Sequence, residues 1–209
     1  MIIAPRTTLR DLEDPVDIET VRMLLRPLVE ADVDDLWPLV SNPEIPKQMS
    51  WEAHKTREET HEWVLRQAEA RARGTGVVWG LEREHHVVGC IGLGAIAWQD
   101  RAWRRDHAEL GYWLAPPLWG QGFMTEAVRG VIAFGFDDLG LHKIETQCLA
   151  ENAASRRVIE KSGFRFVGRR EEDVWRDEKW HAQLLYELTI TEWSDTTATR
   201  RFYRPPQGQ

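Results

Sequence analysis

The feature that most constrains the fold is a glycine-containing turn between a strand pattern and a helix pattern. Residues 106–114 alternate in polarity as a half-covered strand does, and Pro116-Pro117 ends that strand. Residues 119–124 read Trp-Gly-Gln-Gly-Phe-Met, and an apolar helix pattern runs on to about residue 138. A strand-to-helix turn presents free backbone N–H groups and the positive end of the helix dipole, and glycines let an anion come close. The turn predicts a phosphate site; a tight turn with glycines for steric reasons is the alternative.

Other motifs with chemical meaning are excluded. A Walker loop ends in Gly-Lys-Ser/Thr, and no such triplet occurs. Gly92, Gly94 and Ala97 match the dinucleotide pattern Gly-x-Gly-x-x-Ala, but they lie inside a strand-like run and not at the start of a helix. His-Glu-x-x-His and Gly-x-Ser-x-Gly are both missing, so we expect neither a metal site nor a serine hydrolase.

The rest of the chain alternates between strand and helix patterns. An early meander followed by strands that alternate with helices predicts an α/β (α+β) fold, a mixed sheet with helices on both faces. Thr56 opens one helix with a capping box, and Gly74 ends it. Seven strands are expected at 19–26, 77–83, 87–97, 106–114, 143–150, 164–171 and 180–191, and helices at 32–41, 56–73, 121–138 and 152–162.

The 209 residues suit a single domain. Neither repeats nor low-complexity linkers interrupt residues 19–192, which we take as that domain, with a leader (1–18) and a polar tail (193–209) outside it. No apolar run approaches the ~20 residues that a membrane helix needs, and the acidic start of the chain is unlike a signal peptide. We therefore expect a cytoplasmic protein without a membrane partner.

Charge and cysteine content narrow the class further. The chain has 27 Lys and Arg against 34 Asp and Glu, a net charge of −7, which argues against a nucleic-acid partner and is compatible with a cationic substrate. Cys90 and Cys148 lie far apart in apolar, strand-like surroundings. We expect two buried thiols, not a disulfide or a metal site.

Three blocks in this order carry a family resemblance. Residues 109–114 read Glu-Leu-Gly-Tyr-Trp-Leu, residues 125–127 read Thr-Glu-Ala, and the run from Asn152 to Phe164 follows about thirty residues past the turn. Taken with the turn itself, residues 19–192 resemble the GNAT superfamily of N-acetyltransferases, and within it the RimJ/RimL-type branch of protein N-terminal acetyltransferases. The resemblance implies acetyl transfer from acetyl-CoA to a primary amine, and a mostly antiparallel sheet.

The resemblance gives the turn a specific ligand. In that superfamily an Arg/Gln-x-x-Gly-x-Gly/Ala turn holds the pyrophosphate of CoA through its amides. Here Trp119 stands in the first position and Met124 in the last, while Gly122 matches the central glycine. The resemblance thus implies acetyl-CoA as the acyl-donating cosubstrate, with its pyrophosphate on residues 119–124.

The resemblance also implies that the pantetheine arm pairs with the end of strand 106–114 like an added strand. Strands 106–114 and 143–150, the fourth and fifth, must then splay apart. Asn152 matches an asparagine that hydrogen-bonds pantetheine; it also suits a helix N-cap, and the two roles are compatible. The expected cofactor-binding residues are Tyr112, Trp113, Leu114, Trp119, Gly120, Gln121, Gly122, Phe123, Met124, Thr125, Asn152 and Arg157.

Glu109 is the expected general base, acting directly or through water, because related enzymes often carry a catalytic Glu on this strand. The alternative is a surface carboxylate paired with Arg104 or Arg105. Lesser candidates lie where RimL-like enzymes place an acid; they are Glu172, Asp173 and His181.

The proton donor to the leaving thiolate is a second expectation. Many members of the superfamily carry a Tyr acid seven residues past the asparagine, but here that position is Ile159. Ser155 is the expected substitute, as in the RimL-like branch, with a small helix-packing residue as the alternative.

The acceptor is expected to be a protein N-terminus or a small amine of polyamine or aminoglycoside type. Its pocket should lie between helices 32–41 and 56–73 and the last hairpin. A CoA-binding module without catalysis is the competing hypothesis, and a homodimer is possible. Tryptophans that could wall the pocket, or simply pack, are Trp37, Trp51, Trp63, Trp98, Trp103, Trp175 and Trp180.

Overall fold

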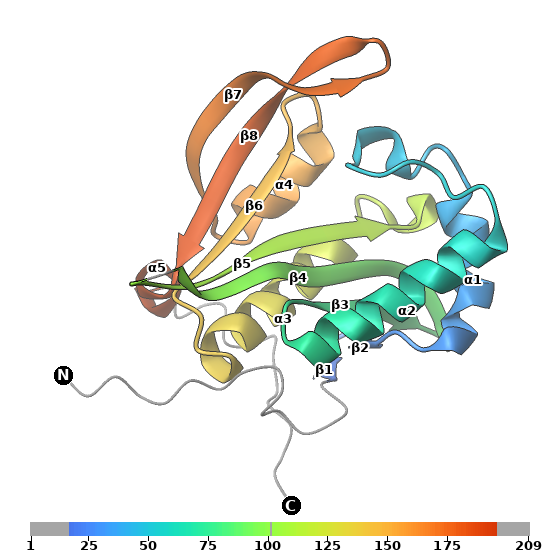
Figure 1. Cartoon of the computed structure of the whole chain (residues 1–209), viewed down its shortest axis with the longest axis horizontal. Helices are drawn as coiled ribbons and strands as arrows, with labels where there is room; N and C mark the ends of the chain where they lie inside the picture. Colours follow the sequence, from blue (N-terminus) through green and yellow to red (C-terminus); the bar gives the residue numbers. More distant parts are fainter. Residues whose placement is uncertain (1–16, 101, 196–209) are drawn as a thin grey trace, which may run out of the picture.

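The structure, a computed structural model, describes residues 17–100 and 102–195 (Figure 1). Its centre is an eight-stranded sheet in the order β1-β2-β3-β4-β5-β6-β8-β7. Every neighbouring pair is antiparallel except β5 and β6, which are parallel. The strands are β1 (Ile18–Glu19), β2 (Leu24–Pro27), β3 (Val77–Arg83), β4 (His86–Asp100), β5 (Trp103–Leu114), β6 (Lys143–Leu149), β7 (Arg165–Arg176) and β8 (Lys179–Thr189).

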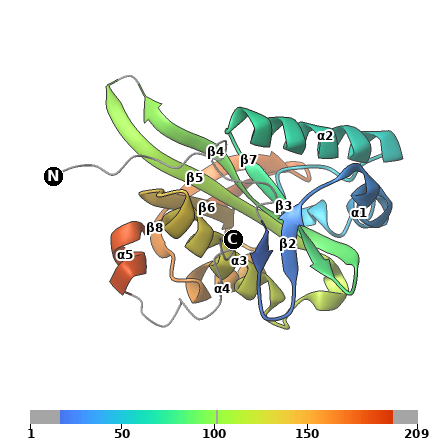
Figure 2. The same ribbon diagram turned by 90° about the horizontal axis from the view of Figure 1, so that it is seen from below.

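Helices cover both faces of the sheet. Figure 2 shows α2 on one side of the strands and α3 and α4 on the other. This arrangement confirms the predicted mixed, mostly antiparallel fold. The helices are α1 (Val33–Val40), α2 (Arg57–Arg73), α3 (Phe123–Ala133), α4 (Ala153–Lys161) and α5 (Ile190–Asp195), with a π-helical turn (Phe134–Asp138) after α3 and short 3-10 turns at Glu30–Asp32, Pro46–Gln48 and Pro116–Leu118.

The predicted count of seven strands is wrong by one, because the expected strand 19–26 is two short strands joined by a turn. The Thr20 amide donates to the Met23 carbonyl (3.0 Å), and the Met23 amide donates to the Thr20 hydroxyl (3.1 Å). These local bonds reverse the chain, and Val21 at the turn is 73% exposed.

Two buried clusters hold the helices on the sheet. The larger lies under α3, α4 and α5 and contains Trp79 and Ile144. The core extends one residue beyond each end of the predicted domain, since Ile18 and Trp193 are buried in this cluster. The smaller lies under α1 and α2 and contains Trp113. The two faces of β5 therefore meet different helices.

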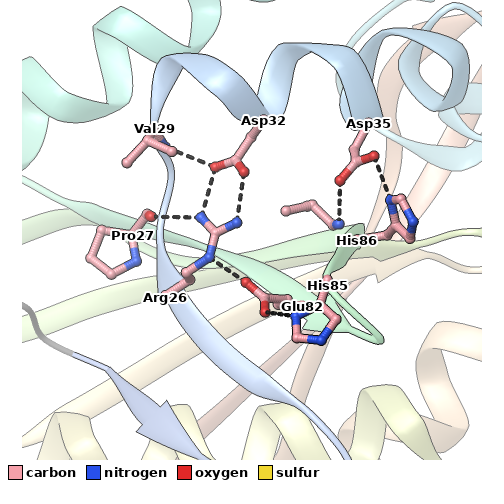
Figure 3. A network of polar contacts seen from close by, with 9 residues as sticks. Arg26, Pro27, Val29, Asp32, Asp35, Glu82, His85 and His86 are labelled. Carbon is pink, nitrogen blue, oxygen red and sulfur yellow. Dashed lines mark hydrogen bonds and ion pairs between the residues drawn. The ribbon is translucent and has the colours of Figure 1, made fainter.

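A polar network fixes the start of α1 against the sheet (Figure 3). The Arg26 guanidinium on β2 donates to both oxygens of Asp32 (2.7 and 2.9 Å) and also binds Glu82 on β3. The hydrogen bond to Asp32 raises the pKa of Arg26 above its ordinary value, against the effect of burial. Asp35 accepts from the Val87 amide (2.8 Å). Bidentate pairs of this kind hold a fixed geometry, so α1 is tied to β2, β3 and β4.

The ends of α2 follow the predicted signals. The Thr56 hydroxyl accepts from the Glu59 amide (3.2 Å), and Gly74 closes the helix in the left-handed region with φ 73°. Within the described residues, no helix is long and apolar enough to cross a membrane.

The predicted splay of the sheet is confirmed between β5 and β6. The two strands pair only over residues 107–109 and 143–145, and they diverge beyond that point in Figure 1. At the fork, the Thr146 hydroxyl donates to the Leu110 carbonyl (2.9 Å) in place of a backbone bond. Beyond residue 109, the edge of β5 that faces β6 therefore has no strand partner among the described residues.

Candidate active site

The open edge of β5 presents backbone groups to the gap between β5 and β6. The Leu110 carbonyl faces β6, where Thr146 binds it, and the Leu114 carbonyl accepts from the Trp119 indole N–H (2.6 Å). Because successive residues of a strand point their backbone groups to opposite sides, the N–H and C=O of Tyr112 lie on this same edge. An extended molecule with amide groups can pair there as a strand would.

The glycine-containing turn lies where β5 passes into α3. Gly120 and Gly122 have φ angles of +74° and +83°, which side-chain-bearing residues rarely adopt. Gly122 is the N-cap of α3, and no side chain caps this end of the helix. In the described part of the chain, the amides of Gly120, Gln121 and Gly122 donate no hydrogen bond to a protein acceptor. These amides and the helix dipole together suit an anion.

Other groups of the turn make contacts within the protein that stabilise it. The Trp119 amide donates to the Pro116 carbonyl (3.1 Å), so this amide is already used. The Gln121 side chain donates to the Pro117 carbonyl (2.8 Å). Phe123 and Met124 are buried in the main core. Their side chains anchor α3, so only their backbone amides, in the first helical turn, are left to bind an anion.

Three side chains meet across the gap from three different elements. The Tyr112 hydroxyl on β5 lies 2.9 Å from Ser155 Oγ on α4, and Ser155 also interacts with the Cys148 thiol on β6. Burial raises the pKa of Cys148 to about 11 and raises that of Tyr112 above its ordinary value, so both groups are protonated at neutral pH. The side-chain role of Tyr112 was not predicted, because its contact with Ser155 joins segments far apart in the sequence.

Asn152 is the N-cap of α4, three residues before Ser155. Its Oδ1 accepts from the Ser155 amide (2.9 Å), so the N-cap role is filled. Within the described residues its side-chain NH2 has no acceptor, which leaves two donors for a ligand. Arg157 is exposed on α4, and Thr125 is half-buried in the first turn of α3.

Glu109 lies at the fork, on the face opposite α3. Ala108 and Leu110 are buried in the main core, so the side chain between them points to the α1 and α2 side, as that of Trp113 does. Glu109 is exposed and its Oε1 accepts from the Gln147 side chain (3.0 Å). Among the described residues no cation pairs with it, and Arg104 instead pairs with Asp106.

The lesser acid candidates are placed differently. Asp173 pairs with Arg170 (3.7 Å), and Glu172 is exposed on a bulged part of β7. Both ring nitrogens of His181 have partners: Nδ1 contacts Glu151, and Nε2 lies 3.1 Å from the Arg176 carbonyl. None of these three described residues is hydrogen-bonded to Glu109 at the fork.

The predicted acceptor elements are tied together by a residue that the sequence did not single out. Arg176, near the tip of the β7–β8 hairpin, donates to the carbonyls of Met49 and Trp51 between α1 and α2. Trp51 also packs edge-on against Trp113. Of the other tryptophans, Trp37, Trp63 and Trp98 are half-buried and Trp103 is exposed, while Trp175 and Trp180 pack edge to face at the exposed hairpin tip.

These donors match the chemistry of CoA in two places. Amides without an acceptor among residues 17–100 and 102–195, at a helix N-terminus that no described side chain caps, suit its pyrophosphate. An open strand edge together with the Asn152 amide suits the two amide groups of pantetheine. The residues present therefore fit the cosubstrate that the sequence predicts.

Comparisons with known proteins agree with this geometry. A model of the acetyltransferase (GNAT) domain matches residues 22–165. The chain is 31% identical over 153 residues to the uncharacterized N-acetyltransferase YoaA of Bacillus subtilis, across 72% of this chain and 84% of that protein. It is 28% identical to the FsC-acetyl coenzyme A-N(2)-transacetylase of Aspergillus fumigatus, across 72% of this chain and 65% of that protein.

A solved structure shares the fold. RimL, described as a ribosomal L7/L12 alpha-N-protein acetyltransferase in complex with coenzyme A, superposes with a TM-score of 0.77 at 22% identity, over 84% of this chain and 99% of that one. The family match and the named relatives favour catalysis over the competing hypothesis of a binding module. The chain belongs to the GNAT acetyltransferase family and is an acetyl-CoA-dependent N-acetyltransferase.

Proposed function

We propose that the enzyme acetylates the α-amine of a peptide or protein N-terminus, with Glu109 as the general base. The observation that carries this proposal is the position of Glu109, an exposed carboxylate without an ion-pair partner among the described residues, at the fork between β5 and β6. The amine would approach from the α1 and α2 side of the sheet, opposite α3 and α4. The function named for RimL supports this acceptor class.

The energetics of deprotonation suit this acceptor. At pH 7, loss of a proton costs an α-amine of pKa about 7.8 roughly 1 kcal/mol, against about 4–5 kcal/mol for a lysine-like amine of pKa about 10.4. A single exposed carboxylate with one amide donor can supply the smaller amount directly or through water. Glu109 would take the proton from the attacking amine.

Ser155 is the proposed proton donor on the other face of the gap. When bound, acetyl-CoA supplies a thioester whose carbonyl carbon accepts the amine. The Tyr112 phenol lies 2.9 Å from Ser155 Oγ and can donate to that oxygen. Ser155 can therefore pass its proton to the departing sulfur and take the phenol proton in its place, and solvent returns a proton to Tyr112 when the product leaves. A thiol of pKa about 8.5 gains at most ~2 kcal/mol from an acid at pH 7. Ser155 therefore assists the reaction without being indispensable.

A small-molecule amine is the second candidate acceptor. The Arg176 contacts with Met49 and Trp51 link the β7–β8 hairpin to the segment between α1 and α2, across the acceptor side. The Aspergillus fumigatus relative is named for transfer to FsC.

A cytoplasmic location and a homodimer stay predictions.

A panel of amines distinguishes the two acceptors. We expect CoA release with peptides that carry a free N-terminus, and release at least about 100-fold slower with the same peptides blocked by an N-formyl group and containing lysine, because the lysine amine costs more to deprotonate. Release with polyamines or aminoglycosides but not with any peptide would overturn the peptide assignment in favour of the second candidate. The measurement is thiol appearance with each acceptor at pH 7, with mass spectrometry to locate the acetyl group.

A further inference from the structure

We propose that Arg22, between β1 and β2, is a positioning residue for CoA that orients and neutralises the turn at residues 119–124. The proposal rests on that turn holding the pyrophosphate. Neither composition nor motif spacing points to Arg22, which is 99 residues from Gln121 in the sequence. The structure brings it against the start of α3, where it contacts three residues.

Those contacts involve three residues of the turn and of the first helical turn. Arg22 Nη1 donates to the Gln121 carbonyl (3.0 Å). Its backbone N–H and Nε donate to the two carboxylate oxygens of Glu126, each at 2.7 Å. Its guanidinium carbon lies 4.0 Å from the centre of the Phe123 ring. A guanidinium held by hydrogen bonds and an aromatic ring has little freedom to move.

The bond to Gln121 fixes the direction of an amide that the ligand needs. A trans peptide points its C=O and its N–H to opposite sides. Because Arg22 holds the Gln121 carbonyl, the N–H of Gly122 in the same peptide points away from Arg22. That N–H donates no bond to a protein acceptor in the described part of the chain. Gly122 has no side chain that could hold this peptide plane, and α3 has no side-chain cap among the described residues.

The bond to Glu126 removes a charge that opposes the ligand. Glu126 lies in the first turn of α3, where its side chain is 8% exposed, close to the helix end that attracts anions. An unpaired carboxylate there would repel a pyrophosphate and weaken the field of the helix. Arg22 is its ion-pair partner, so the turn keeps its attraction for phosphate. The expected consequence is affinity for CoA, with little influence on chemistry at the thioester.

The test measures the dissociation constant of CoA by titration calorimetry, together with KM for acetyl-CoA and for acetyl-pantetheine, which lacks the pyrophosphate. We expect Arg22→Ala to raise the CoA dissociation constant and the KM for acetyl-CoA about 20-fold, while the KM for acetyl-pantetheine and kcat change less than about twofold. Arg22→Lys keeps the charge but cannot bond Gln121 and Glu126 at the same time, so it should raise the dissociation constant of CoA about fivefold. Arg169→Ala removes an exposed arginine paired with Glu171 and serves as the matched control.

A double variant shows whether weaker CoA binding in Arg22→Ala comes from the unpaired charge of Glu126 or from loss of folding. Arg22→Ala with Glu126→Gln removes the uncompensated carboxylate, so it should bind CoA about fivefold more tightly than Arg22→Ala alone. Unchanged CoA binding in Arg22→Ala and Arg22→Lys would overturn the role of Arg22, as would an equal loss with acetyl-pantetheine. If a charge placed in the turn by Gly122→Asp also leaves CoA binding unchanged, the pyrophosphate assignment itself fails, which is a different result.

Discussion

Glu109→Gln should lower kcat/KM about 100-fold for a lysine-like amine at pH 7, and about tenfold or less for a peptide α-amine. The variant keeps the size of the side chain and its contact with Gln147 but cannot take a proton. General bases contribute about 10²–10⁴-fold where the substrate must lose a proton, and the need falls as the amine becomes neutral. The loss of kcat/KM in Glu109→Gln should therefore become smaller as the pH approaches the pKa of the acceptor amine. The measurement is a pH profile of kcat/KM from pH 6 to 10.

Glu145→Gln is the matched control for that prediction. Glu145 is the β6 neighbour of Glu109 in the sheet, but it pairs with Lys143 (2.7 Å). We expect its rate and pH profile to follow the wild type. A Glu109→Gln enzyme with full rate on a lysine-like amine would rule out Glu109 as the base.

Gly122→Asp should weaken CoA binding about 100-fold. The position needs a positive φ of 83°, which Asp and Asn tolerate better than other residues with side chains. A Cβ at this position would lie 3.5 Å from Arg22 Nη2, so the new carboxylate would also draw that guanidinium away from Gln121 and Glu126. For a separation of about 5 Å and an effective dielectric constant of about 40, repulsion between one carboxylate and two phosphate charges amounts to about 3 kcal/mol. The measurement is the dissociation constant of CoA in wild type and variant at the same ionic strength.

Gly122→Asn separates charge from shape in this experiment. Asn and Asp have the same size and similar backbone preferences. If CoA affinity falls by less than about tenfold in the Asn variant, the larger loss in the Asp variant is due to charge. Raised salt should narrow the difference between the two variants, because repulsion near the surface is screened. Equal losses in both, at low and high salt, would contradict an anion site at Gly122.

Much of the fold could be predicted from local patterns, and its departures have local causes. The alternation in residues 106–114 and the signals at Thr56 and Gly74 are short-range, and each is confirmed. The β4 and β5 arms extend to Asp100 and Trp103, beyond the ranges expected, because the charged residues between them conceal the alternation. The helix pattern after the turn changes to a π-helical turn at 134–138, which periodicity does not distinguish.

The candidate site could be predicted only where its residues are neighbours in sequence. The turn at 119–124 is one such segment, and its spacing to Asn152 identified the family. The contacts of Arg22 with Gln121 and of Tyr112 with Ser155 join residues 99 and 43 positions apart, and no pattern in a single sequence encodes such pairs. The contact of Arg176 with Met49, which links the elements of the proposed acceptor side, joins residues 127 positions apart and was missed for the same reason.

We expect CoA to lie in the gap between β5 and β6 with its pyrophosphate on the turn at residues 119–124. Amide hydrogen exchange with and without CoA measures this placement residue by residue. CoA should slow exchange at the amide of Tyr112, which points into the gap, and at the amides of Gly120, Gln121 and Gly122, which have no protein acceptor among the described residues. Exchange in α2 should not change. Protection that spares both segments, or that appears instead on α1 and α2, would contradict the claim.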